Sequence, residues 1–191
     1  EGHLKRLCDE IGKPMPAFTE SHIEVVPGAD GSEVDDARSL EDHEALANFI
    51  MTRVRDLTML DEQRNPINTL HASLAGGRKT MTFYLGYAMS LFGRREDSLS
   101  HVLISKGYES LRDFWYPSVS QGQLHGFDNK PLRTSDDKPL MPRDAEVTLA
   151  PIPFVRHRHD LPDLLSQSGS SVHFSERVRL INLGEQPDEL R

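Results

Sequence analysis

The spacing of apolar residues predicts two amphipathic helices in the first third of the chain. In residues 1–11, apolar side chains recur every three or four positions, and Gly12 follows where a helix C-terminus is expected. Ser39 with Asp42 three residues later is a capping-box pattern ahead of a second such run. This pattern predicts a long helix over residues 40–60.

A third helical run, residues 79–92, is apolar nearly all round and is followed by Gly93, where a C-terminal glycine cap belongs. Such a helix is expected to be covered on more than one side, and a second copy of the chain is one way to cover it. Near the end of the chain, residues 162–165 predict a short helix and residues 175–183 a terminal one, within a helix and tail over 175–191.

Short apolar and β-branched segments between the helices predict strands over residues 22–26, 67–74, 99–105 and 145–152. Strands that alternate with helices predict an α/β fold with a mainly parallel sheet. From Tyr116 to Pro142 the chain is rich in Gly, Pro, Ser and Asp, so an irregular excursion is expected, with residues 118–143 at its centre.

Length and composition fit one globular domain over residues 1–191. The chain has 37% hydrophobic and 27% charged residues, which excludes a disordered or collagen-like protein. Lys and Arg number 22 against 30 Asp and Glu, and the net charge of -8 disfavours DNA as a partner. One cysteine, and no signal peptide or long apolar run, predict a cytoplasmic protein without a membrane partner.

The candidate chemistry lies in the stretch from His71 to Met81. Here a strand end is followed by Gly76-Gly77 and then by Arg78-Lys79 at the start of a helix. Glycines let backbone N–H groups approach an anion, and a helix N-terminus carries partial positive charge, so this pattern favours a phosphate site. The alternative is a tight β-to-α turn with two surface cations.

Other motifs are weaker or missing. The glycines do not have Walker A spacing, and there is no Gly-x-Ser-x-Gly elbow, so ATP hydrolysis and serine hydrolysis are disfavoured. Arginines flank His157 and His159 and oppose a bound cation, so no metal site is expected there. Arg38-Ser39 is a second candidate for ligand contact, with a helix cap and a solvated arginine as its alternative.

The aromatic run Phe114-Trp115-Tyr116-Pro117 is also open to two interpretations. Its rings can stack on a nucleic-acid base, or they can belong to the core, as aromatic clusters at a strand boundary more often do.

The run from Ser73 to Met81 and the segments that follow it resemble the CRISPR-associated CARF-domain family of ring nucleases. The resemblance is carried by residues 73–81, 83–88, 91–94, 99–104, 114–117 and 152–156. It covers most of residues 1–183 and weakens between Ser118 and Arg143.

This resemblance implies a Rossmann-like homodimer that binds cyclic oligoadenylate in a groove across the two-fold axis. It further implies that a ribose 2′-hydroxyl attacks the neighbouring phosphate of cyclic tetra-adenylate, without metal or cofactor, to leave 2′,3′-cyclic phosphate ends. Family members begin with a strand and a Ser/Thr-bearing loop, so an N-terminal strand and helix are expected to be missing from this chain.

Within that interpretation, residues of the glycine turn take specific roles. Arg78 and Lys79 are the candidate catalytic residues, because a guanidinium can bind two phosphate oxygens and an ammonium can assist the departing 5′-oxygen. The candidate ligand-binding residues are Ser73, Ala75, Gly76, Gly77, Thr80, Arg38 and Ser39. Two other classes stay open: a sensor that binds the ring without cutting it, and a generic nucleotide-binding enzyme.

Overall fold

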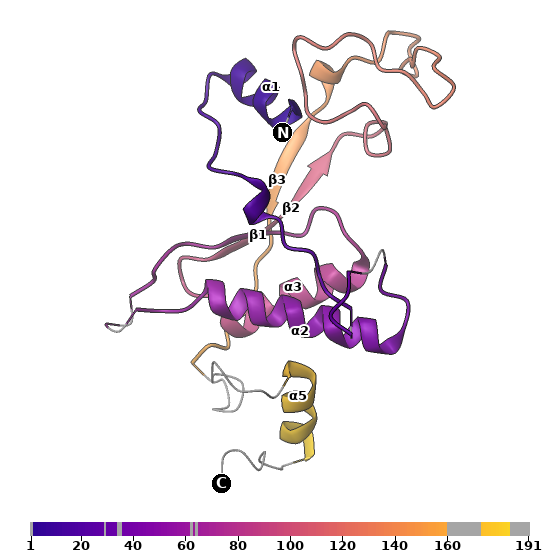
Figure 1. The fold of residues 1–191 in the computed structure, drawn as a ribbon. Helices are drawn as coiled ribbons and strands as arrows, with labels where there is room; N and C mark the ends of the chain where they lie inside the picture. Colours follow the sequence, from indigo (N-terminus) through magenta and orange to yellow (C-terminus); the bar gives the residue numbers. More distant parts are fainter. Residues whose placement is uncertain are drawn as a thin grey trace. The chain divides into compact units, whose positions relative to one another are not determined.

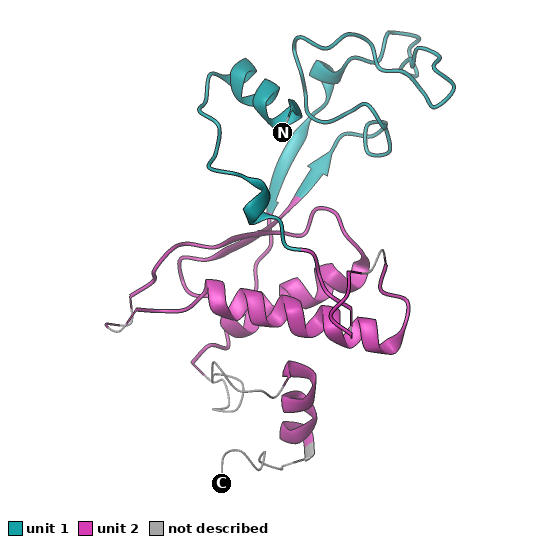
Figure 2. Cartoon of the chain, in the orientation of Figure 1, with its two compact units in different colours: residues 1–24, 102–150 teal, residues 25–101, 151–191 magenta. Residues whose placement is uncertain are grey.

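The computed structural model describes residues 2–28, 30–33, 36–61, 63, 65–159 and 173–183. The chain divides into two compact units (Figure 2): unit 1 comprises residues 1–24 and 102–150, and unit 2 residues 25–101 and 151–191. Each unit is built from two separate stretches of sequence, so neither is one continuous segment. The single domain over residues 1–191 stays a prediction.

From residue 40 onward, helices and strands follow one another along the chain, as Figure 1 shows. The helices are α1 (Gly2–Ile11), α2 (Leu40–Leu57), α3 (Lys79–Phe92) and α5 (Phe174–Leu183), with short 3-10 helices η1 (Glu20–His22) and η2 (Pro142–Asp144). The strands are β1 (His71–Ser73), β2 (Ser98–Ile104) and β3 (Val147–Pro151). This order confirms an α/β protein. None of the helices in the described ranges is long and apolar enough to span a bilayer.

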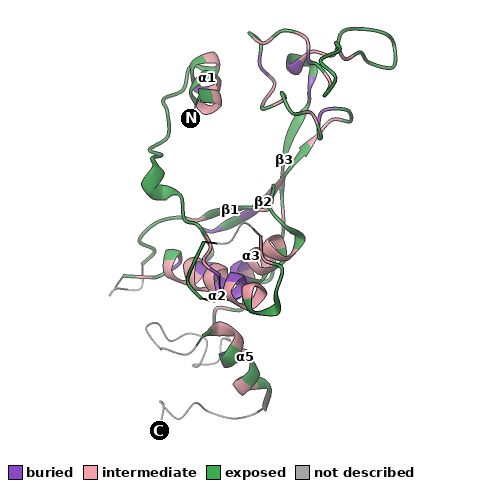
Figure 3. Cartoon of the chain, turned by 45° about the vertical axis from the view of Figure 1, so that its right-hand side comes forward, coloured by how far each residue is buried: buried purple, intermediate pink, exposed green. Residues whose placement is uncertain are grey.

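The core of unit 2 lies where α2 and α3 pack together, and both helices carry buried residues (Figure 3). The core residues are Met51, Val54, Ala72, Ala88, Met89, Leu91, Phe92 and Leu99. The predicted helices 1–11, 40–60 and 79–92 are confirmed, with α2 ending at Leu57. The terminal helix is confirmed too and begins one residue early, at Phe174, whereas the short helix over 162–165 lies outside the described residues.

Helix α2 begins as its sequence predicts. Asp42 donates its backbone N–H to Ser39 Oγ at 3.0 Å, and Ser39 donates its own to Asp42 Oδ2 at 3.3 Å. This reciprocal pair satisfies two backbone donors at the helix start, which is the physical content of the capping box.

The sheet is mixed, so the prediction of a mainly parallel sheet is wrong for the described strands. Strands β1 and β2 are parallel, with Ala72 opposite Leu99. Strand β3 lies on the other side of β2 and runs antiparallel to it: Ser105 donates to the carbonyl of Glu146, and Ile152 to that of Leu99. The chain returns to β2 through residues 105–146 without a crossover helix, and such a return gives an antiparallel pair.

The prediction of a strand over residues 22–26 is also wrong. Residues 20–22 form η1, and the apolar side chains Ile23 and Val25 are exposed. The segment has the alternation of a strand, but a strand needs a neighbour for its backbone hydrogen bonds, and none of the three strands of the sheet pairs with it. The predicted strands 67–74 and 145–152 are shorter in the structure, at His71–Ser73 and Val147–Pro151.

Unit 1 contains the predicted irregular excursion, and the structure shows that unit 1 has a hydrophobic core of its own. Between Tyr116 and Met141 the chain forms no helix or strand beyond isolated bridges. Buried Tyr108, Leu124 and Ala145 nevertheless pack together, with further apolar side chains around them. Packing of this kind fixes a segment that has no periodic pattern.

Helix α1 is attached to this excursion through one carboxylate. Glu10 accepts hydrogen bonds from the hydroxyls of Ser118, Ser120 and Tyr116 and from the backbone N–H of Val119. The hydrogen bonds from the Ser120 and Ser118 hydroxyls lower the pKa of Glu10 to about 2, below its usual 4.5.

Candidate functional site

The candidate site begins at the end of β1 and continues through a glycine turn into α3. The Ser73 hydroxyl accepts the backbone N–H of Ala75 at 3.2 Å, which bends the chain out of the strand. Gly76 and Gly77 follow with φ of +95° and +75°, a left-handed conformation that residues with a Cβ rarely adopt. The sequence therefore needs glycine at both positions for the chain to turn into α3.

Helix α3 starts directly after this turn, with Arg78 as its N-cap. Arg78 has an extended backbone and its side chain makes no capping hydrogen bond. The N-terminus of α3 thus presents backbone N–H groups that no side chain of its N-cap satisfies, next to two cationic side chains. The predicted combination of glycine turn, helix start and cations is present in the fold.

The ends of the two cationic side chains differ. Arg78 donates to Asp36 Oδ2, so its guanidinium is held against the loop that precedes α2. Lys79 is exposed, and its ammonium makes no hydrogen bond or ion pair with the residues that the structure describes. A ligand phosphate would therefore meet one cation that is already paired and one that is not.

Asp36 joins two of the sequence-predicted candidates. Arg38 Nε donates to the same Asp36 oxygen at 3.2 Å, so Arg38 and Arg78, forty positions apart in the sequence, share one carboxylate. Partial burial acts to raise the pKa of Asp36, but the hydrogen bonds from Arg38 and Arg78 outweigh it, and the pKa lies below its usual value. Asp36 is thus an ionised partner of both guanidiniums.

No pattern in the sequence singles out Asp36, because it lies in an acidic loop. Its one signal is its place two residues before Arg38, a spacing that permits a local ion pair. The pairing with Arg78 is a long-range contact. The local sequence patterns around Asp36 and around Arg78 therefore do not predict it.

The remaining candidates lie around the turn with different environments. Thr80 is half-buried in the first turn of α3, and Ala75 is exposed beside Gly76. Ser39 is the N-cap of α2, so its hydroxyl already accepts a backbone N–H. The binding role of Ser39 stays a prediction, and a ligand would compete with the Asp42 backbone N–H for the Ser39 hydroxyl.

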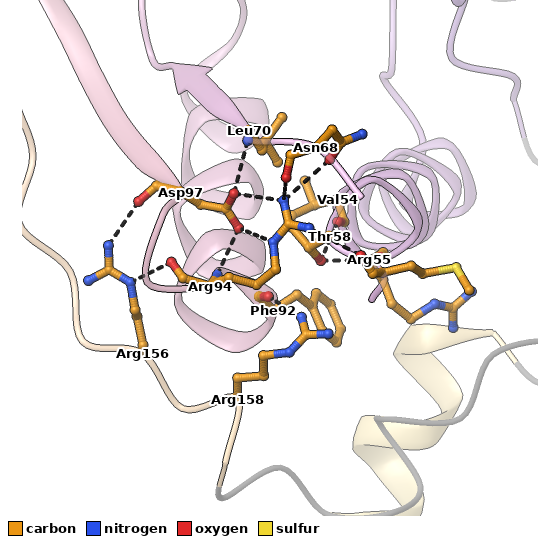
Figure 4. Close-up of polar contacts among 11 residues, drawn as sticks. Val54, Arg55, Thr58, Asn68, Leu70, Phe92, Arg94, Asp97, Arg156 and Arg158 are labelled. Atoms are coloured by element: carbon orange, nitrogen blue, oxygen red, sulfur yellow. Dashed lines mark hydrogen bonds and ion pairs between the residues drawn. The ribbon is translucent and has the colours of Figure 1, made fainter. Parts of the chain in front are cut away.

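The stretch that contains His157 and His159 has a structural use. Arg156 donates to the carbonyls of Arg94 and Asp97 at 2.9 Å each, and Arg158 donates to the carbonyl of Phe92 at 2.5 Å (Figure 4). Cations that bind carbonyls at and just beyond the C-terminus of a helix stabilise that end. No cluster of three His, Cys, Asp or Glu side chains suited to a metal occurs among the described residues.

The family model of a CRISPR-associated protein, described as CRISPR-associated protein NE0113, matches residues 3–182. The chain belongs to this family. The match contains the glycine turn, both cations and all three strands, so the resemblance to a CRISPR-associated family that the sequence predicted is confirmed. Neither the curated proteins nor the solved structures give a match.

Proposed function

We propose that this protein is a metal-independent ring nuclease that opens cyclic tetra-adenylate and so ends type III CRISPR signalling. The observation that carries the proposal is the glycine turn with two left-handed residues, which leads into the N-terminus of α3 beside Arg78 and Lys79. Membership of a CRISPR-associated family supports a ligand from that signalling system. The protein acts in the cytoplasm and needs no cofactor, DNA or membrane.

In the proposed reaction, the substrate supplies its own nucleophile. A ribose 2′-oxygen loses its proton and attacks the adjacent phosphorus, the bond from phosphorus to the 5′-oxygen breaks, and the 5′-oxygen takes up a proton. A linear product with a 2′,3′-cyclic phosphate results. The protein has to hold the 2′-oxygen in line and stabilise the charge on the phosphoryl oxygens.

The residues of the turn divide this task. Backbone N–H groups at Gly76 and Gly77 and the start of α3 bind phosphoryl oxygens, with Ser73, Ala75 and Thr80 beside them. Arg78 binds two phosphate oxygens once it leaves Asp36, and Arg38 with Ser39 borders the site. Lys79, whose ammonium has no partner among the described residues, stabilises the departing 5′-oxygen.

A homodimer is part of the proposal. Thr80, Phe83 and Tyr87 follow one another at helical spacing on α3, and the Phe83 side chain is 66% exposed. A second copy placed on this face would cover Phe83. It would also bring its own glycine turn toward the same molecule of cyclic tetra-adenylate.

A sensor is the second candidate function. The same turn would bind the ring and leave it intact, and the binding would control an effector. The contacts that support the nuclease support the sensor equally. The two functions therefore differ only in whether the bound ring is cleaved.

The test is single-turnover cleavage of cyclic tetra-adenylate with a chelator present, beside equilibrium binding. The wild type should yield linear products with 2′,3′-cyclic phosphate ends. Lys79→Ala should cleave about 10²–10³ times more slowly and keep most of its affinity, because the ammonium acts on charge that forms in the transition state. Lys106→Ala, in unit 1, is the matched control.

Three results would count against the nuclease. Intact ring bound by the wild type would favour the sensor. Lys79→Ala at the wild-type rate would remove the catalytic assignment. Activity that disappears with chelator and returns with a divalent cation would contradict the metal-independent mechanism.

A further inference from the structure

Unit 1 contains a cavity of about 440 Å³ that the proposed function does not use. Its walls come from α1, through His3 and Arg6, from the segment before the excursion, through Arg112 and Trp115, and from the excursion itself, through Gln121 and Gln123. The volume lies in the range of small-molecule sites, and most of these lining residues are polar or charged. A polar ligand with an aromatic part would suit such walls.

The aromatic part of the site is Trp115. The three rings of the run 114–116 have different environments: Phe114 packs on Tyr108 in the core, Tyr116 donates to Glu10, and Trp115 is 61% exposed in the cavity wall. His3 stacks on the indole with ring centroids 4.2 Å apart and planes within 14°. A second flat ring can stack on the exposed part of the indole, as bases do on aromatic side chains.

Two side-chain amides supply acceptors. Gln121 Nε2 donates to the carbonyl of Asp113 at 3.0 Å, and Gln123 Nε2 donates to that of Leu132 at 2.7 Å. With the amino groups held on the main chain, the carbonyl oxygens remain as acceptors. They match adenine, whose exocyclic amino group offers two N–H donors, better than uracil, which offers a single N–H donor at N3 between two carbonyl oxygens.

The cations of the cavity match an anion. Arg6 donates to His3 Nδ1 at 2.5 Å, which fixes its guanidinium beside the stacked rings. Arg112 is 80% exposed and lies 3.9 Å from the Asp113 carboxylate, a loose surface pair. Two guanidiniums against one carboxylate leave the site positive within a chain of net charge -8.

We propose that this cavity is a second ligand site, which binds a nucleotide whose base carries an amino group, with adenylate as the simplest example. The base stacks on Trp115, its amino group donates to Gln121 or Gln123, and its phosphate binds Arg6 and Arg112. The inference does not depend on the proposed ring nuclease, because every residue in it belongs to unit 1 and the glycine turn belongs to unit 2.

The test uses the fact that Trp115 is the single tryptophan of the chain, so intrinsic tryptophan fluorescence reports this cavity alone. Titration of the full chain with AMP should change the fluorescence saturably. Adenosine, which lacks the phosphate, and UMP, which lacks the amino group, should bind at least about ten-fold more weakly. Inorganic phosphate at the same concentrations should leave the fluorescence unchanged.

Variants then locate the site, with binding followed by equilibrium dialysis where tryptophan is absent. Trp115→Leu should weaken AMP binding by about ten-fold or more, since stacking of a base on an aromatic ring is lost. Arg112→Gln should weaken AMP and leave adenosine unchanged. Phe127→Ala is the matched control, because Phe127 is an exposed aromatic of the same excursion that does not line the cavity.

The Gly77→Val variant separates this inference from the proposed function. It should abolish binding of cyclic tetra-adenylate at the glycine turn and leave AMP binding in unit 1 unchanged. AMP binding that disappears in a folded Gly77→Val variant, or that keeps the wild-type affinity in Trp115→Leu, would overturn the second site. Equal affinity for AMP and UMP would overturn its base preference.

Discussion

At the scale of single residues, Asp36 occupies the position of an anion between Arg38 and Arg78. Its carboxylate accepts hydrogen bonds from both guanidiniums, as a bound phosphate would. The arginines are therefore held in place before a ligand arrives, and the ligand has to displace the carboxylate. Asp36 thus lowers the affinity of the site for anions while it orders the cations.

Removal of that carboxylate should strengthen ligand binding. Asp36→Asn is expected to raise the affinity for cyclic tetra-adenylate by about two- to five-fold, because partly exposed ion pairs are worth roughly 0.2–1 kcal/mol. Equilibrium binding at two salt concentrations is the measurement. Asp30→Asn is the control: it removes the same charge from the same loop, where Asp30 binds only Ser32 in the described structure. A lower affinity of Asp36→Asn would instead mean that its ordering of the arginines outweighs its competition.

At the scale of elements, a buried ion pair connects the elements of unit 2. Asp97 accepts hydrogen bonds from the backbone of Leu70 and from Arg94, and Arg94 also donates to the carbonyls of Met59 and Asn68 (Figure 4). The two side chains are almost completely buried, at 3% and 0% exposed. The pair thereby fixes the end of α3, the start of β2 and the segments before β1.

Breaking this pair should be costly. Asp97→Asn is expected to lower the free energy of unfolding by roughly 3–5 kcal/mol, because the guanidinium of Arg94 is left buried without its counter-charge. Urea unfolding measures the change. The control is Asp9→Asn, which breaks the exposed pair with Lys5 and should cost at most about 1 kcal/mol. Equal effects of the two changes would contradict a special role for the buried pair.

The attachment of α1 should depend on pH through Glu10. Its pKa of about 2 in the folded protein lies below the usual 4.5, so its stabilising contribution is complete above pH 4.5 and is lost as the pH falls toward 2. Glu10→Gln should therefore lower the melting temperature at neutral pH, with a difference from wild type that shrinks through this window. Glu109→Gln, an exposed residue of unit 1, serves as the control. A difference that stays constant down to pH 2 would contradict the assignment.

The elements that the sequence predicted are those whose signals are local. Ser39 with Asp42 marks the start of α2, and Gly93 marks the end of α3, because capping involves residues only a few positions apart. The prediction of a strand over residues 22–26 is wrong, because a strand forms only with a partner elsewhere in the chain. The direction of β3 failed for the same reason: the path of the excursion, which has no periodicity, sets it.

In the candidate site, too, the local features could be predicted from the sequence and the long-range contacts could not. The glycine turn and its cations lie within ten residues and could be predicted from spacing. The contact of Asp36 with Arg78 spans 42 positions, and the exposure of Trp115 between two packed aromatic neighbours depends on the fold of the excursion. Neither is contained in a local pattern.

At the scale of the whole molecule, a net charge of -8 makes the protein a poor general binder of polyanions. The cations Arg38, Arg78 and Lys79 are instead concentrated around the turn from β1 to α3. Binding should accordingly favour a compact anionic ligand that fits this turn over an extended nucleic acid, whose remaining phosphates would meet a surface of like charge.

The proposed dimer is tested at Phe83, which shares a face of α3 with Thr80 and Tyr87. Phe83 stacks on Tyr87, while Tyr87 also contacts Phe174 of α5, so Phe83 is the more exposed of the two rings. Phe83→Lys should weaken dimerisation by about ten-fold or more in sedimentation equilibrium, because a charge replaces an apolar side chain that the second copy would bury. Phe127→Lys, at an exposed aromatic of unit 1, should leave association unchanged.

Cleavage of cyclic tetra-adenylate should fall together with the dimer fraction of Phe83→Lys, because the two-fold groove needs a glycine turn from each copy. A wild-type monomer at micromolar concentration with the ring bound would contradict both the dimer and the shared groove.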